Sequence, residues 1–193
     1  MKNPIRCEWC LQDPLYLRYH DHEWGVPVHD DQTHFEFLVL ESAQAGLSWL
    51  TILRRREHYR RLYESFDPAK VARFDNKKIL SILRDKGIIR NRKKIESSVN
   101  NAKKFLAIQE EFGSFDRYIW LFTEGKPQNN HYKRIGDIPA STPLSETITK
   151  DLKKRGFQFI GATIVYAHMQ ATGLVNDHVT DCFRHQEKKK KNE

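Results

Sequence analysis

The sequence has little cysteine and no long apolar run. Three cysteines in 193 residues are an odd number and too few for a disulfide framework, which leaves metal binding or free thiols. No stretch approaches the roughly 18 apolar residues of a membrane span, and the first residues have no apolar core of the kind that a signal peptide needs. We therefore expect a cytoplasmic protein with no membrane partner.

Acidic residues are outnumbered by basic ones. Thirty-three Lys and Arg against 25 Asp and Glu give a formal net charge of +8, which favours a polyanionic partner. The four lysines at 188–191 supply half of that excess, since +8 minus 4 leaves +4. We expect residues 186–193 to form a disordered basic tail. The remaining basic bias is modest.

Strand-like alternation is also scarce, whereas helical periodicity recurs. Apolar residues follow the spacing i, i+4, i+7 and i+11 in two segments, namely Ile95, Val99, Ala102 and Leu106, and Ile160, Ile164, Ala167 and Ala171. Each pattern predicts a helix with one buried stripe. Asp67 before Pro68, and Ser145, mark helix starts. The sequence predicts an all-α protein in which residues 1–185 form one unit, either a single domain or two helical lobes linked by the irregular segment 123–143.

Four residues at the two ends of the chain suggest a metal site. His178 and Cys182 are spaced i, i+4, so one helical turn would direct an imidazole and a thiolate to a common point. Cys7 and His20 supply the same two ligand types near the start. If the two pairs meet, zinc would join the ends of the chain. Cys10 leaves open which thiolate binds, and the Cys7-x-x-Cys10 spacing also admits a thiol oxidoreductase.

The segment 37–53 carries one charged group, Glu41, in an otherwise apolar and uncharged run. Burial of an unpaired carboxylate costs several kcal/mol, so Glu41 needs a partner or lines a cavity that a ligand enters. A buried ion pair or a cap on a neighbouring helix would also explain it. Gly46, Leu47 and Trp49 follow directly, and the glycine predicts a helix break beside the carboxylate.

Aromatic residues are concentrated near the start of the chain, at Trp9, Tyr16, Tyr19 and Trp24. Any one of them is explained by an ordinary core. Together with an isolated carboxylate, they are what a pocket for an extruded nucleobase requires, because rings stack on its faces and an acceptor binds its edge donors.

Residues 145–173 predict a helical hairpin. A polar helix over 145–155 is followed by a turn from Gly156 to Gly161 and by an apolar helix over 162–172. Glycines at both ends of the turn allow a close backbone approach, and the start of the second helix offers N–H groups to a phosphate. By itself the pattern is only an α-hairpin. Lys150, Lys153, Lys154 and Arg155 add positive charge to the hairpin. A second basic group stands at the start of another helix and is either a phosphate contact or a solvated face: Arg90, Arg92, Lys93 and Lys94.

These features occur in contiguous blocks: DPLY at 13–16, YHD at 19–21, EWGVP at 23–27, LE at 40–41, QAGLSW at 44–49, GIIR at 87–90, KRGF at 154–157 and GLVNDHV at 173–179. In this order the blocks resemble the DNA-3-methyladenine glycosylase I family, a branch of the helix-hairpin-helix DNA glycosylases, over residues 7–182. The resemblance implies a monomeric enzyme that hydrolytically excises 3-methyladenine from alkylated double-stranded DNA and releases the free base. The alternative is a noncatalytic, zinc-stabilised DNA-binding protein.

The resemblance also implies roles for single residues. Glu41 would contact the edge of the flipped base as the catalytic group, Tyr19 and Trp49 would stack on it, and Trp9 and Tyr16 would be pocket walls. Leu47, beside Gly46, would be the wedge that fills the gap in the duplex. Gly156, Phe157, Gly161 and Lys154 would contact DNA. Cys7, His20, His178 and Cys182 would hold one structural Zn²⁺ per chain.

The position of the catalytic aspartate of most related glycosylases is Asn176 here. Asp177 is one residue away and is interpreted as orienting the zinc site. Alkylation at N3 makes the purine cationic and weakens its glycosidic bond, so that selection of the damaged base becomes the main task of the protein. Stacking rings and a buried carboxylate prefer a cationic purine over neutral adenine, because the charge strengthens both cation–π interactions and hydrogen bonds. No lysine stands where a Schiff base would form, and monofunctional hydrolysis by water is therefore expected.

Overall fold

The structure, a computed structural model, describes residues 4–185, and the predicted basic tail at 186–193 lies outside the described residues. Its helices are α1 (Pro14–His22), α2 (Asp31–Gln44), α3 (Trp49–Leu53), α4 (Arg56–Leu62), α5 (Pro68–Val71), α6 (Asn76–Arg84), α7 (Arg92–Phe112), α8 (Phe115–Trp120), α9 (Pro143–Lys154) and α10 (Ala162–Ala171). Short 3-10 turns are η1 (Glu8–Cys10), η2 (Glu64–Phe66), η3 (Leu121–Thr123) and η4 (Ile135–Asp137). No helix within residues 4–185 is long and apolar enough to cross a membrane.

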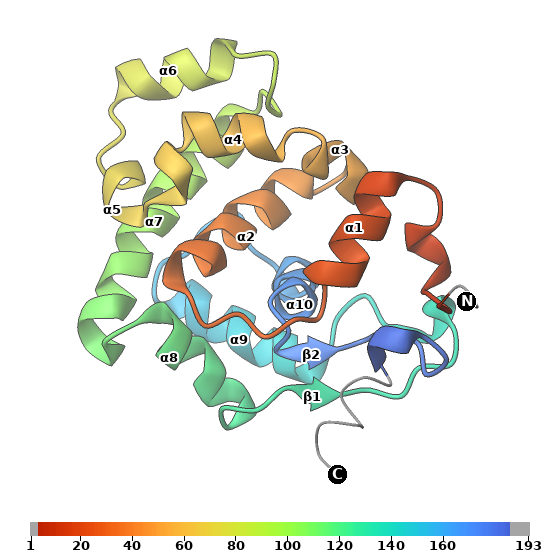
Figure 1. Ribbon diagram of the computed structural model, residues 1–193. Helices are drawn as coiled ribbons and strands as arrows, with labels where there is room; N and C mark the ends of the chain where they lie inside the picture. Colours follow the sequence, from red (N-terminus) through yellow and green to blue (C-terminus); the bar gives the residue numbers. More distant parts are fainter. Residues whose placement is uncertain (1–3, 186–193) are drawn as a thin grey trace.

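Two long helices, α2 and α7, organise the molecule (Figure 1). Helices α5 and α6 pack on α7, which also contacts α8, while α2 contacts α3, α7, α8 and α10. Helices α9 and α10 form the expected hairpin and pack against each other. The protein is therefore mostly helical, as predicted. The division of residues 1–185 into one domain or two lobes stays a prediction.

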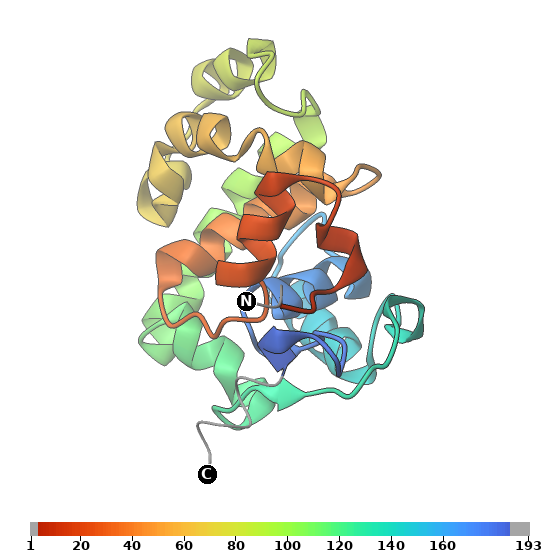
Figure 2. The same ribbon diagram turned by 45° about the vertical axis from the view of Figure 1, so that its right-hand side comes forward.

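The ends of the described chain lie side by side (Figures 1 and 2). The backbone N–H of Phe183 donates to the carbonyl of Ile5 at 2.9 Å. Two short strands, β1 (Gln128–Asn129) and β2 (Val175–Asn176), pair in parallel. This pairing attaches the largely irregular segment 123–143 to the chain that follows α10.

Helix starts follow capping chemistry. Asp67 accepts hydrogen bonds from the N–H groups of Ala69 and Lys70, which confirms the predicted start at Pro68. The prediction at Ser145 was wrong by one turn. Thr142 caps α9 and Ser145 closes the reciprocal capping box three residues later, an arrangement that satisfies two helix-end N–H groups at once.

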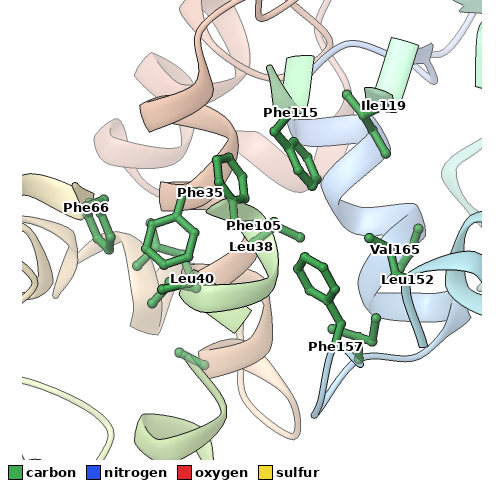
Figure 3. Close-up of a cluster of buried hydrophobic side chains, with 14 of the residues drawn as sticks. Phe35, Leu38, Leu40, Phe66, Phe105, Phe115, Ile119, Leu152, Phe157 and Val165 are labelled. Carbon is green, nitrogen blue, oxygen red and sulfur yellow. The ribbon is translucent and has the colours of Figure 1, made fainter. Parts of the chain in front are cut away.

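The main core lies between α2, α7, α8, α9 and α10 (Figure 3). The rings of Phe105 and Phe115 stack with their centroids 4.3 Å apart. Two predicted stripes need correction, because Leu106, Ile164 and Ala167 are only partly buried. The buried positions are Ile95, Ser97, Ser98, Val99, Asn101, Ala102, Phe105 and Ile108 in α7, and Val165, Tyr166, His168, Met169 and Ala171 in α10. Both helices have neighbours on more than one side, so a single stripe does not describe them.

Candidate functional site

A cavity of about 300 Å³ opens where α1, α2, α3 and α10 meet. Its volume lies at the lower end of the range for ligand pockets, about 300–1,000 Å³, and so suits a small ligand. The lining residues are Trp9, Tyr16, Tyr19, Trp24, Glu41, Gln44, Ser48, Trp49, Ala167 and Gln170. The structure thus brings together all five residues predicted to contact the base.

Helix α2 carries Glu41 into the interior. Every residue from His34 to Ala43 is buried, and Glu41 itself is only 4% exposed. Within residues 4–185 its carboxylate forms no ion pair and accepts no hydrogen bond, and burial alone raises its pKa to about 8. The alternatives of an ion pair or a helix cap were therefore wrong. The carboxylate stands unpaired at the wall of the cavity.

The aromatic walls come from separate segments. The Tyr19 and Trp49 rings have centroids 5.6 Å apart, and Trp9 makes edge contacts with Tyr16 at 5.3 Å and Trp24 at 5.2 Å. The indole Nε1 of Trp49 is buried and has no hydrogen-bond partner among the described residues. Burial also raises the pKa of Tyr19, with the nearby Glu41 as the next cause. The cavity thus combines aromatic ring faces with an unpaired carboxylate.

The Tyr16 hydroxyl has a second role in this wall. It accepts a hydrogen bond from the backbone N–H of Leu50 at 2.9 Å, and an ion pair between Asp13 and Arg54 joins the same two helices at 2.7 Å. These contacts fix α3, and with it Trp49, against α1. Tyr16 is therefore both a lining residue and a support.

Sequence reasoning missed part of the lining. Gln44 lies three residues after Glu41 on α2, and that helical spacing was the available signal. Gln170 and Ala167 lie on α10, far along the chain, and no local pattern pointed to them. The Gln170 amide donates from Nε2 to Asp177 at 2.7 Å. Because a carboxylate only accepts, this bond fixes the orientation of the amide.

The interpretation of Asp177 needs correction. Its buried carboxylate accepts hydrogen bonds from Asn130 at 2.6 Å, from Tyr166 and from Gln170, and it therefore orients a cavity residue and not the metal ligands. Asn176 is fully buried and donates to Asn129 at 3.2 Å. It does not line the cavity.

The four predicted metal ligands meet in the interior. The ligand atoms of Cys7, His20, His178 and Cys182 all lie within 4.8 Å of one another, and all four residues are buried. Tetrahedral zinc, with Zn–N of about 2.05 Å and Zn–S of about 2.3 Å, requires ligand separations of about 3.3 Å for N–N and about 3.5 Å for S–N. The observed values are 3.2 Å between the two imidazole nitrogens, and 3.4–3.7 Å for the sulfur–nitrogen pairs Cys182–His20, Cys182–His178 and Cys7–His178.

Each imidazole is held by its other nitrogen. His20 Nδ1 contacts Asp21 at 2.8 Å, and Arg6 pairs with that carboxylate. His178 Nε2 contacts the carbonyl of Trp24 at 3.0 Å. Such partners orient each ring so that its other nitrogen points into the cluster. The residues therefore fit zinc, although the helical turn predicted for 178–182 is an irregular turn closed by the Cys182 N–H and the Val179 carbonyl.

Cys10 lies outside this cluster. Its thiol donates to the carbonyl of Cys7 at 3.0 Å, and burial is the main cause that raises its pKa to about 11. A redox thiol needs the opposite shift, because the thiolate is the reactive form. The geometry favours Cys7 as the ligand and does not favour an oxidoreductase.

The predicted DNA-contacting residues fall into two groups. Leu47 is 41% exposed and follows Gly46, whose φ of +83° is a left-handed conformation that glycine adopts without strain. Lys154 is exposed. Gly161 precedes α10 without a side-chain cap, and a Cβ there would meet no heavy atom within 4 Å. These positions remain accessible to a duplex.

Phe157 does not present its side chain to a duplex, and a DNA contact at this residue stays a prediction. Its side chain is 4% exposed and packs in the main core near Leu152 and Val165 (Figure 3). Phe159, two residues later, is the exposed aromatic of the turn, at 38%. Arg155 is also occupied, since it pairs with Glu111 at 2.6 Å and Asp151 at 2.7 Å.

Comparison with known proteins gives one consistent result. The methyladenine glycosylase profile matches residues 9–185. DNA-3-methyladenine glycosylase 1 of Escherichia coli (strain K12) is 47% identical over 177 residues, which cover 92% of this chain and 95% of that protein. A crystal structure of 3-methyladenine DNA glycosylase I is 48% identical, with a TM-score of 0.90 over 93% of this chain and 98% of that chain.

A second solved structure concerns recognition of the base. The 3-methyladenine DNA glycosylase I of Staphylococcus aureus, described as revealing the structural basis of 3-methyladenine recognition, is 39% identical. Its TM-score is 0.89, over 92% of this chain and 95% of that chain. On the sequence match and the shared fold together, the chain belongs to the methyladenine glycosylase family.

Proposed function

We propose that this protein excises 3-methyladenine from alkylated double-stranded DNA by monofunctional hydrolysis of the N-glycosyl bond. The observation that carries the proposal is the unpaired Glu41 carboxylate in an aromatic cavity of about 300 Å³. The relatives' names and the recognition study on the Staphylococcus aureus enzyme support the same substrate. We also propose that the protein acts as a monomer in the cytoplasm.

Selectivity follows from the charge of the damaged base. In the free cavity, burial keeps Glu41 largely protonated at neutral pH, because its pKa is about 8. A cationic purine lowers that pKa by its positive charge and gains an ionic hydrogen bond in return, whereas neutral adenine does neither. Stacking on Tyr19 and Trp49 adds a cation–π contribution of about 2 kcal/mol in a desolvated site.

The reaction needs little help from the protein. Methylation at N3 places a positive charge on the purine, so cleavage of the bond to the sugar returns an electron pair to the ring and releases a neutral base. Water adds to the anomeric carbon and loses a proton. The protein's contribution is to extrude, bind and orient the cationic base, and to keep undamaged bases out.

Contact with the duplex is assigned to two exposed segments. Leu47 would enter the gap left by the flipped nucleotide. The uncapped start of α10 at Gly161 would bind a phosphate oxygen, and Lys154 would add positive charge. This is the helix-hairpin-helix mode that the sequence predicted.

We also propose one structural Zn²⁺ held by Cys7, His20, His178 and Cys182. The burial of these four residues and the closeness of their ligand atoms support it, and bound zinc would join the two ends of the chain without taking part in the chemistry.

The test is release of methylated base. Purified protein should release 3-methyladenine from methylated duplex DNA, and Glu41→Gln should reduce release at least tenfold. Quenching of tryptophan fluorescence by free 3-methyladenine should also weaken in that variant. A noncatalytic DNA-binding protein would bind the duplex, release no base and show no quenching, and that result would replace the proposal by its alternative.

A further inference from the structure

Lys94, at the start of α7, binds the end of the helix that carries Glu41. Its ammonium group donates to the carbonyls of Ala43 at 2.7 Å and Ala45 at 2.8 Å. The last carbonyls of a helix lack partners within the helix, and that end carries a partial negative charge. Lys94 therefore supplies both the missing donors and a compensating charge. The exposed segment 45–48, which carries Leu47, begins immediately after the end of α2.

The same side chain reaches the hairpin. The Lys94 ammonium lies 5.7 Å from the ring centroid of Phe159, the exposed aromatic of the turn between α9 and α10. Two asparagines later in α7 also bind that turn. Asn100 donates to the carbonyl of Gly156 at 2.9 Å, and Asn101 exchanges two hydrogen bonds with the backbone of Gln158 at 2.8 and 2.9 Å. Helix α7 thus holds both exposed segments, the one after α2 and the hairpin turn.

Neighbouring basic residues behave differently. Lys93 is exposed and has no hydrogen bond or ion pair with any described residue, and Arg92 pairs with Glu96 at 2.7 Å. Lys94 is partly buried, and burial lowers its pKa. Two of its three N–H donors are directed at carbonyls of its own chain. The sequence left a phosphate contact and a solvated face open for this basic group, and for Lys94 the contacts favour neither.

We infer that Lys94 is a positioning residue, which fixes segment 45–48 relative to the hairpin turn so that a duplex meets Leu47 and the start of α10 together. The inference rests on the proposed function. A wedge is effective only if it is held in place before the duplex arrives, because ordering it during binding would cost free energy. The base cavity itself, with Glu41 and its rings, does not contain Lys94.

The test compares Lys94→Met with Lys93→Met. Each removes one positive charge from adjacent positions of α7, and only the first removes the contacts to Ala43 and Ala45. We would measure single-turnover release of 3-methyladenine from a methylated duplex and from the same strand without its complement. Binding of the free base would be measured by the quenching of tryptophan fluorescence by free 3-methyladenine. The salt dependence of base release from the duplex would be recorded for the wild type and both variants.

In Lys94→Met, the single-turnover rate of base release should fall at least tenfold on the duplex and less than threefold on the single strand. Its affinity for the free base should be unchanged. In Lys93→Met, the rate of base release should fall by the same factor on both DNA forms, and its salt dependence should be weaker than that of the wild type. Equal behaviour of the two variants would overturn the inference in favour of a phosphate contact. Loss of free-base binding by Lys94→Met would overturn it in favour of a general structural role. Failure of the wild type to release base from either DNA would instead refute the proposed function.

Discussion

Replacement of Glu41 by glutamine should change how the stability of the protein depends on pH. The folded protein holds this carboxyl at a pKa of about 8, against 4.5 for the free group, and desolvation is the only cause. Between these values the folded chain binds a proton that the unfolded chain has released. The free energy of unfolding therefore falls as pH rises, because the unfolded state binds fewer protons. Glutamine has the same shape and no titration, so this dependence should disappear.

The size of the effect follows from the two pKa values. Each pH unit between them corresponds to about 1.4 kcal/mol. The Gln variant should match the wild type near pH 4.5, exceed it by about 3 kcal/mol at pH 7, and exceed it by about 5 kcal/mol above pH 8. The functional carboxylate thus costs stability, which is the usual relation between a binding site and its fold.

Urea unfolding of the two proteins at pH 5, 6, 7 and 8, with zinc present throughout, measures this difference. Titration of the histidines affects both proteins equally and cancels in the comparison. A difference that stays constant over this pH range would refute the reasoning, since it would mean that Glu41 is already ionised and compensated in the folded state. Added 3-methyladenine should stabilise the wild type more than the variant.

Three further predictions concern other parts of the molecule. Cys182→Ser should abolish stoichiometric zinc, measured by atomic absorption, and lower the thermal midpoint, whereas Cys10→Ser should do neither; retention of zinc by the first variant would exclude the proposed site. Asp177→Ala should cost about 1–3 kcal/mol in urea unfolding, because neutral donors lose a buried acceptor, while exposed Asp181→Ala should cost less than about 0.5 kcal/mol. Leu47→Ala should slow base release from duplex DNA at least tenfold and leave binding of free 3-methyladenine unchanged; an equal loss in both assays would contradict a wedge role.

Much of the candidate site could be predicted from residues whose chemistry is unusual in their local context. A lone carboxylate in an apolar helix indicated a cavity, because its burial is costly in any fold. The four residues proposed to bind zinc were recognisable by type, and the cap at Asp67 by its position before proline. Local rules were less reliable where several neighbours compete, as in α10, where Ile164 is partly exposed and Val165 is buried.

The amino-acid sequence by itself determined the residue types of the site and the helical class, because these depend on composition and on spacings within a few turns. Only the tertiary structure decided that Gln170 lines the cavity and that Asp177 holds it. It also decided that Phe157 lies in the core while Phe159 is exposed, and that Lys94 turns toward α2. Each of these depends on which surfaces of distant segments pack together, and short-range periodicity carries no information about that.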